Sequence, residues 1–92
     1  MISATTRPRL ASKARLRFDR KSTRYMLLYP EKGLVLNPTS ADILKLCTGE
    51  HTVAAIVQQL AEKYGKDAPE VEHDVVGFLR AMANRGLVQD AP

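Results

Sequence analysis

The chain has 92 residues and a net charge of +4, which is the size of one small domain with one modest hydrophobic core. Hydrophobic residues make up 45% of it, but no apolar run reaches the roughly 18 residues that a membrane-spanning helix needs. The single cysteine, Cys47, excludes an intramolecular disulfide framework, and the first residues lack the apolar segment of a secretory signal. We therefore expect a cytoplasmic protein that does not contact membranes.

Positive charge is concentrated in the first third of the chain. Residues 1–32 carry nine Lys or Arg side chains and two acids, whereas residues 33–92 carry five Lys or Arg side chains and eight acids. The basic part can attract nucleic acid or an acidic partner. The simpler interpretation is a solvated strand face together with a basic tail.

The first 29 residues predict a tail and two strands. Residues 1–9 are polar, contain a proline and show no periodicity, so we expect a flexible basic tail there and a single domain over residues 10–90. Residues 14–19 alternate between apolar and charged side chains, which indicates a half-buried strand. Residues 24–29 are apolar on both faces, as expected for a central strand that is covered on two sides.

A third strand leads directly into a helix. Residues 30–33 form a turn, and the apolar run at residues 34–36 follows it. Asn37 is a preferred N-cap residue and Pro38 a preferred first helical residue. Because short turns join the three strands, we expect an antiparallel meander with the third strand at one edge, held rigidly by this junction.

Three helices are expected after this junction. Each begins near a capping residue and ends near a glycine: residues 38–47 with Gly49, residues 53–64 with Gly65, and residues 68–84 with Gly86. The third starts with Asp67-Ala68-Pro69-Glu70, which is similar to a capping box, and Leu87 and Val88 should fold back onto the core. The expected fold class is α+β and winged-helix-like, with a three-stranded antiparallel β meander followed by three α-helices.

The sequence offers little for catalysis or metal binding. Cys47 lies on the inward side of the first helix, where a free cysteine usually packs as a small hydrophobic residue. His51 and His73 do not have the spacing of metal ligands, and no glycine-rich phosphate-binding loop or nucleophile motif occurs. We expect a protein that is not an enzyme and has no metal site or cofactor.

A helix–turn–helix beside a small sheet is also the layout of a winged-helix protein. Nucleic-acid binding is therefore the alternative function. The helix that would enter the groove begins with residues 67–74, which contain four acids and no Lys or Arg. Base-reading helices use mostly Arg, Lys, Asn or Gln, and carboxylates would face phosphates. Nucleic-acid binding through this helix is unfavourable, and the basic strand face with Arg15 and Arg17 is the surface that the alternative requires.

The edge strand suggests a different kind of site. A strand with one unpaired side presents N–H and C=O groups to an extended peptide, and the apolar stripe of the third helix would form the wall beside it. Composition alone fits equally well a short edge strand that Pro30, Lys32 and Pro38 protect from pairing. An unpaired edge can also pair with a second copy of the chain and give a homodimer.

A set of short segments carries a family resemblance. In chain order they are RPRL (7–10), ARLRFD (14–19), LYPE (28–31), LVLN (34–37), ILKLCTG (43–49), TVAAIV (52–57), DV (74–75), FL (78–79) and RGLV (85–88). Together they resemble the PqqD family, the pyrroloquinoline quinone biosynthesis protein D, over about residues 7–88. The resemblance implies a RiPP recognition element: a peptide chaperone in PQQ biosynthesis that binds the precursor peptide PqqA and presents it to the radical SAM enzyme PqqE.

The resemblance also implies a binding site. In such domains the peptide adds as a strand to the third strand and lies against the third helix. Carried onto this chain, the peptide-binding residues would be Gly33, Leu34, Val35, Leu36, Val71, Val75, Phe78 and Leu79. Of these, Val71, Val75 and Phe78 fit the core of the domain equally well.

Overall fold

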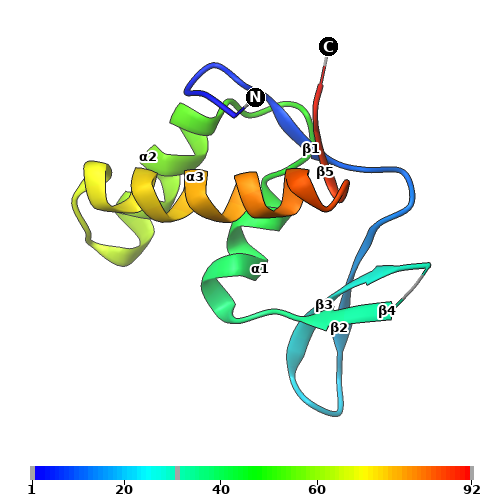
Figure 1. Ribbon diagram of the computed structural model, residues 1–92. Helices are drawn as coiled ribbons and strands as arrows, with labels where there is room; N and C mark the ends of the chain where they lie inside the picture. The colour runs from blue at the N-terminus through cyan, green and yellow to red at the C-terminus, as the bar shows by residue number, and fades with distance from the viewer. Residues whose placement is uncertain (1, 31, 92) are drawn as a thin grey trace.

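The computed structural model describes residues 2–30 and 32–91. Its elements in chain order are β1 (Pro8–Leu10), β2 (Arg15–Asp19), β3 (Arg24–Tyr29), β4 (Lys32–Val35), α1 (Pro38–Lys45), α2 (Val53–Tyr64), α3 (Ala68–Asn84) and β5 (Val88–Asp90) (Figure 1). Strands β2, β3 and β4 form one antiparallel sheet in that order, and β1 pairs with β5 in a second sheet. The α+β class, the meander and the three helices expected from the sequence are confirmed.

The meander is covered by helix on one face only. Leu27, at the centre of β3, pairs with Leu16 of β2 and Leu34 of β4, is fully buried, and lies on the face that belongs to the core. Of the three helices, α1 packs on β3, while α2 and α3 pack mainly on each other. Met26 and Leu28, on the other face of β3, are therefore only half-buried. The prediction that this strand is covered on two sides is wrong.

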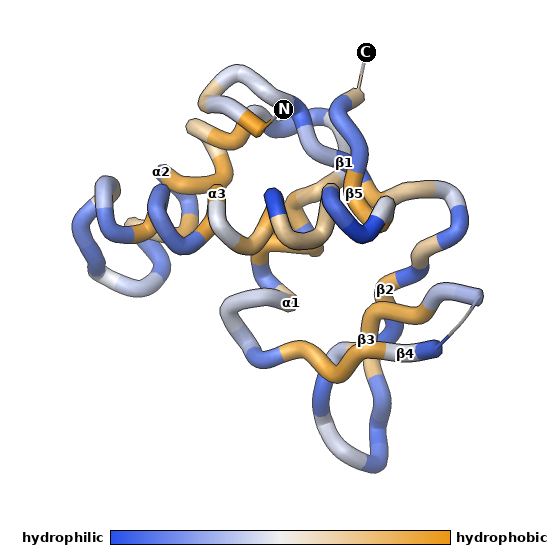
Figure 2. The backbone as a smooth tube through the Cα atoms, viewed as in Figure 1, coloured by the Kyte–Doolittle hydropathy of each residue, from blue (hydrophilic) through white to orange (hydrophobic). Residues whose placement is uncertain are grey.

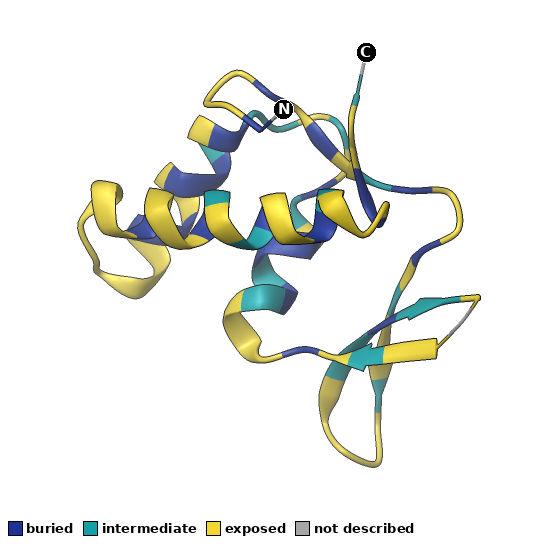
Figure 3. Cartoon of the chain, viewed as in Figure 1, coloured by how far each residue is buried: buried dark blue, intermediate teal, exposed yellow. Residues whose placement is uncertain are grey.

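The core lies mostly where the three helices meet (Figures 2 and 3). The residues with fully buried side chains come from all three helices, from β3, and from the two chain ends: Leu27, Ile43, Leu44, Ile56, Leu79, Leu87, Val53, Val75 and Pro8. Tyr64, which ends α2, lies outside this core and is 38% exposed.

Two of the three predicted N-caps are present. The Asn37 side chain accepts a hydrogen bond from the backbone N–H of Ser40 (2.8 Å), and Thr52 accepts one from Ala55 (3.1 Å). The capping box at Asp67 does not form: the Asp67 side chain makes no capping hydrogen bond. An N-cap side chain bonds the N–H of the second or third helical residue; in α3 the second residue, Pro69, has no N–H, and the N–H of the third, Glu70, receives no bond from Asp67.

The predicted end of α3 is a Schellman motif. Gly86 has a φ of +72°, the N–H of Leu87 donates to the Met82 carbonyl (3.0 Å), and the N–H of Gly86 donates to the Ala83 carbonyl (2.9 Å). These are the two hydrogen bonds that define the motif. Leu87 and Val88 are buried, as expected, and the chain then continues into β5.

The sheet of β1 and β5 is not foreseen by the sequence. Residues 8–9 belong to the predicted flexible tail, yet Pro8 pairs with Asp90 and Leu10 pairs with Val88. Residues nearer the start of the chain also pack on the domain, because the carbonyls of Ala4 and Thr6 accept hydrogen bonds from the first N–H groups of α2. Residues 2–9 therefore pack against the domain, and the predicted boundary at residue 10 does not mark the end of a tail. Met1 lies outside the described residues.

Two element boundaries also differ from the prediction. The first helix ends at Lys45 rather than residue 47, because the backbone that follows forms hydrogen bonds with β1. The N–H of Leu10 donates to the Cys47 carbonyl (3.2 Å), and the N–H of Gly49 donates to the Pro8 carbonyl (3.0 Å). The predicted turn at residues 30–33 contains residue 31, which lies outside the described residues, and its last two residues already belong to β4.

Candidate functional site

The backbone register of β4 determines which of its polar groups are open. Leu36 N–H donates to the Tyr25 carbonyl of β3 (2.9 Å). Alternate residues of an antiparallel strand exchange hydrogen bonds with the same neighbour, so Leu34 also faces β3. The N–H and C=O groups of Gly33 and Val35 point away from β3, and no described strand pairs with β4 on that side.

Two contacts tie helix α3 to the regions at the two ends of β4. At one end, the Arg85 guanidinium donates a hydrogen bond to the Tyr29 hydroxyl (2.8 Å), and Tyr29 pairs with Lys32, the first residue of β4. At the other end, Thr39, which follows β4 closely, lines a cavity of about 50 Å³ together with Val75 of α3. The strand and the helix therefore run in opposite directions, as Figure 1 shows.

One face of α3 is turned toward this strand. Phe78 precedes Arg85 by seven residues, so both lie on the same side of the helix two turns apart. Phe78 is half-buried and packs against the edge of the core, as does Leu34 of β4. These two are half-buried apolar side chains, one on β4 and one on this face of α3.

The structure divides the predicted site residues into two groups. Gly33 and Val35 are exposed, and Leu34 and Phe78 are half-buried, so these four are within reach of a ligand. The other four are core residues, because Leu36, Val71, Val75 and Leu79 are each 7% exposed or less. The sequence alone did not separate the groups, since the apolar stripe of a helix does not reveal which members lie at its margin.

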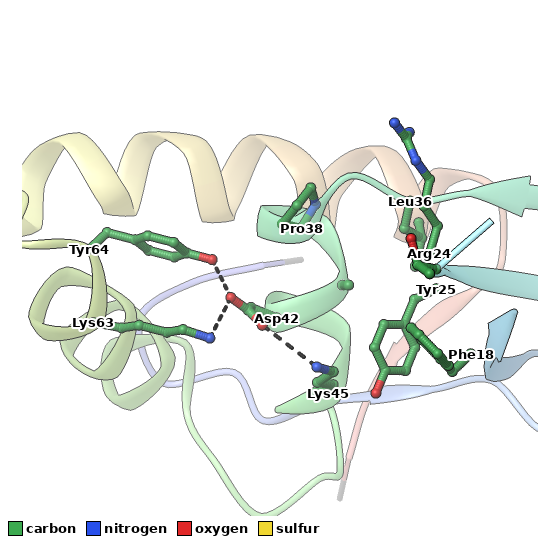
Figure 4. A pocket seen from close by; sticks show the side chains of 11 residues that line it. Phe18, Arg24, Tyr25, Leu36, Pro38, Asp42, Lys45, Lys63 and Tyr64 are labelled. Carbon is green, nitrogen blue, oxygen red and sulfur yellow. Dashed lines mark hydrogen bonds and ion pairs between the residues drawn. The ribbon is translucent and has the colours of Figure 1, made fainter. Parts of the chain in front are cut away.

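A second concave surface crosses α1 (Figure 4). This cleft of about 490 Å³ lies between aromatic residues of the meander, such as Phe18 and Tyr25, and the end of α2. Asp42 of α1 accepts hydrogen bonds from Lys63 Nζ (2.9 Å) and from the Tyr64 hydroxyl, both on α2. The polar groups of the cleft are thus engaged with one another, and they join α1 to α2.

The same cleft also joins α1 to the sheet. Lys45 Nζ lies 4.2 Å from the centroid of the Tyr25 ring and 3.8 Å from the Asp42 carboxylate. Partial burial alone would raise the pKa of Asp42, but the hydrogen bonds from Tyr64 and Lys63 outweigh it and hold this pKa below its usual value. Asp42 is therefore ionised at neutral pH and fixes three elements around the start of α1.

Cys47 and the candidate metal ligands of the sequence can now be placed in the structure. Burial raises the pKa of the Cys47 thiol to about 12, and its Sγ donates to the Ile43 carbonyl, so this cysteine packs as a core residue, as predicted. Among residues 2–30 and 32–91, no group of His, Cys, Asp and Glu side chains could hold a metal ion. Within the same residues, no helix has both the length and the hydropathy needed to cross a membrane.

The start of α3 presents negative charge. Asp67, Glu70, Glu72 and Asp74 are all exposed. A helix that enters a DNA groove by its N-terminus would bring these carboxylates against phosphates, which is unfavourable. The geometry of α3 therefore agrees with the argument from the sequence against base reading by this helix.

The fold and the open edge define a class of protein: a small α+β domain in which a strand edge, accompanied by a helix, is accessible to an extended chain. The sequence profile of the family described as coenzyme PQQ synthesis protein D (PqqD) matches residues 24–88. The chain belongs to the PqqD family.

Individual relatives agree with this assignment. The chain is 40% identical, over 98% of its own length and 88% of the relative's, to a protein of Rhodopseudomonas palustris (strain BisB5) named PqqA binding protein. Its structure is similar to the solution structure of the PqqD part of Methylobacterium extorquens PqqCD, described as a functional, stand-alone RiPP recognition element (TM-score 0.83, 32% identity, 97% of this chain and 95% of that one). It is also similar to the crystal structure of PqqD from Xanthomonas campestris (TM-score 0.60, 29% identity, 97% of this chain and 99% of that one).

Proposed function

We propose that this protein is the peptide chaperone of PQQ biosynthesis, which binds the precursor peptide PqqA as an added strand along β4. Membership of the PqqD family and the relatives named PqqA binding protein support this function. The protein holds its peptide for the radical SAM enzyme PqqE and does not itself catalyse a reaction. It works in the cytoplasm, where the precursor is made.

The observation that carries the proposal is the open backbone of β4. Gly33 and Val35 together offer two N–H donors and two C=O acceptors on the side away from β3. These are the groups that a guest strand needs for main-chain pairing, which provides affinity without regard to side chains. The side chains of the guest alternate between the two faces of the extended sheet.

One set of guest side chains would meet the helical face of the site. On that side the guest lies between Leu34 and Phe78, the two half-buried apolar residues that flank β4. The core residues Leu36, Val71, Val75 and Leu79 hold this wall in place from beneath. In this proposal they support the site and do not touch the peptide.

The sharpest test is a single proline in the strand. In Val35→Pro the lost N–H is one that points away from β3, so the sheet keeps all of its internal hydrogen bonds, and edge positions of this kind tolerate proline. We expect normal folding and an affinity for PqqA that is roughly ten- to hundredfold lower, because a guest C=O loses its partner. Isothermal titration calorimetry with synthetic PqqA measures this change.

The matched control is Val35→Thr, which keeps the N–H and the β-branched shape. This variant should bind PqqA within about threefold of the wild type. A correctly folded Val35→Pro variant with unchanged affinity would show that the peptide does not pair with β4. Amide shifts of the isotope-labelled protein give an independent check, since they should concentrate in residues 33–36 and around Phe78.

The same open edge could pair with a second copy of the chain. Such a homodimer would compete with the peptide for Gly33 and Val35. Sedimentation with and without PqqA separates the two, because the peptide should shift a β4-mediated dimer to monomer.

A further inference from the structure

The face of the meander opposite α1 carries a continuous apolar surface. The strand register places Leu28 beside Arg15, and it places Met26 beside both Arg17 and Val35. Residues that pair directly across antiparallel strands project to the same face. We call this set, Arg15, Arg17, Met26, Leu28 and Val35, the outer face.

Gly33 is what makes the outer face continuous. A Cβ atom at this position would lie 3.0 Å from Leu28 Cδ2 and 3.1 Å from Met26 Cε, distances that real Cβ atoms rarely show. The ends of the Met26 and Leu28 side chains therefore lie over the bare backbone of β4. The apolar surface extends in this way from β3 across to the open edge.

No described helix of the domain packs on the outer face. Helix α1 packs on the opposite face of β3, and Val35 on the outer face is 54% exposed. The sequence of β3 is apolar on both faces, which is typical of a strand covered on two sides, but the domain supplies only one cover. Exposed apolar patches of this kind on a small protein commonly mark a site of association.

We propose that the outer face is the docking surface for the enzyme that acts on the bound peptide. The enzyme contacts it through an apolar patch that is bordered by carboxylates. This inference rests on the proposed function. Arg15 and Arg17 are exposed beside the apolar residues, so the complementary surface is apolar with acidic residues at its margin.

The geometry of strand addition explains why this partner is the enzyme. A guest strand on β4 extends the sheet, and every second guest side chain then stands on the outer face next to Val35 and Gly33. A protein docked on the outer face therefore contacts the chaperone and the peptide together. This arrangement lets the enzyme recognise the loaded form.

The alternative occupant is nucleic acid, whose phosphates also bind arginine side chains. Phosphate-binding surfaces combine cations with other polar donors. On the outer face the space beside Arg15 and Arg17 is filled by Met26 and Leu28, and the same row of β2 ends at the acid Asp19, which lies opposite Arg24 and so leaves no net charge at that end. This pattern favours a protein surface.

The test is a double charge reversal, Arg15→Glu with Arg17→Glu. Both residues lie on β2, two strands away from the edge that takes the peptide. We expect PqqE to bind the PqqA-loaded variant at least about tenfold more weakly than the loaded wild type, because like charges now meet across the interface. The affinity for PqqA alone should stay within about threefold of the wild type.

The matched control is Arg20→Glu with Lys21→Glu, which makes the same charge change in the turn that follows β2. It should leave both affinities nearly unchanged. Met26→Gln supplies a second arm, because it removes apolar contact without changing charge and should weaken PqqE binding at high salt as well as at low salt.

The outcomes separate the two proposals. If neither the wild type nor any of the variants binds PqqA, the proposed function is wrong. If PqqA binds normally but the outer-face reversal leaves PqqE binding unchanged, the docking proposal is overturned while the chaperone function stands. Salt-dependent binding of duplex DNA to the wild type that the reversal abolishes, with PqqE binding intact, would also overturn it and assign the arginines to nucleic acid.

Discussion

The helical half of the molecule and the meander use burial in different ways. Among residues 2–30 and 32–91, eight of the nine fully buried large side chains belong to the helices, their connections and the chain ends, and the meander supplies only Leu27. Of the three exposed large hydrophobic residues in the same described part of the chain, Phe18 and Val35 are in the meander, although it is much the shorter part. The helices therefore supply most of the stability of the fold, while the meander keeps apolar surface and open backbone for other molecules.

This contrast predicts that truncation to alanine has very different effects in the two halves. Leu79→Ala empties a fully buried site between the helices and should lower the free energy of unfolding by about 2–5 kcal/mol. Val35→Ala removes an exposed side chain of the meander and should cost within about 0.5 kcal/mol. Urea unfolding followed by circular dichroism measures both. Similar losses for the two variants would contradict the division of roles.

The helix ends offer a second comparison, with one chemical change at two glycines. Gly86→Ala forces an alanine into a left-handed conformation and should destabilise by about 1–2 kcal/mol, because the Schellman motif requires the positive φ. Gly77→Ala, inside α3 with no atom near its Cβ position, should stabilise by about 0.5–1 kcal/mol. Thermal melts should therefore shift in opposite directions, and a shift in the same direction would count against the assigned motif.

The junction between the two halves gives a prediction of intermediate size. Asn37→Ala removes the side chain that caps α1 directly after β4 and should cost about 1 kcal/mol in thermal or urea unfolding. Because β4 enters this helix without a loop, the variant should also loosen residues 33–36, seen as faster amide exchange there than in α2. Equal exchange in both segments would mean that the cap does not restrain the edge.

The smallest effect concerns the charge cluster across α1. The folded-state pKa of Asp42 lies below its usual value near 3.8, so its contribution to stability is present above that pH and is lost as the pH falls through the folded-state pKa. Asp42→Asn should lower the free energy of unfolding by about 0.5 kcal/mol at pH 7, a value typical of largely exposed ion pairs. The difference from the wild type should shrink as the pH falls below 3.8 and through the folded-state pKa. A difference that is constant with pH would exclude the carboxylate as its source.

Local patterns were sufficient to predict most of the fold. Asn37, Thr52 and Gly86 mark helix ends through hydrogen bonds between near neighbours, so the chain segment itself contains the information. The sheet of β1 and β5 joins residues about 80 positions apart through strands of three residues, which are too short to show an alternating pattern. Such a contact depends on the packed helices and is not visible in either segment alone.

The candidate site was predictable as a segment but not atom by atom. The sequence indicated the edge strand at residues 34–36 and the helix beside it. It did not show that Gly33 and Val35 rather than Leu34 and Leu36 carry the open backbone groups, because that depends on the register with β3. The sequence also predicted that the strand with Met26 and Leu28 is covered on two sides, whereas the tertiary arrangement leaves these two residues half-buried at the surface.

The pairing of β1 with β5 also determines how this domain can be joined to other proteins. Pro8 lies opposite Asp90, and Figure 1 shows both ends of the described chain on the side of the molecule away from the tip of the meander. A linker attached at either end of the domain would start on that side and leave the open edge of β4 unobstructed. A second domain can therefore be fused to this one without blocking the peptide site. Such a fusion would keep the second domain close to the bound peptide.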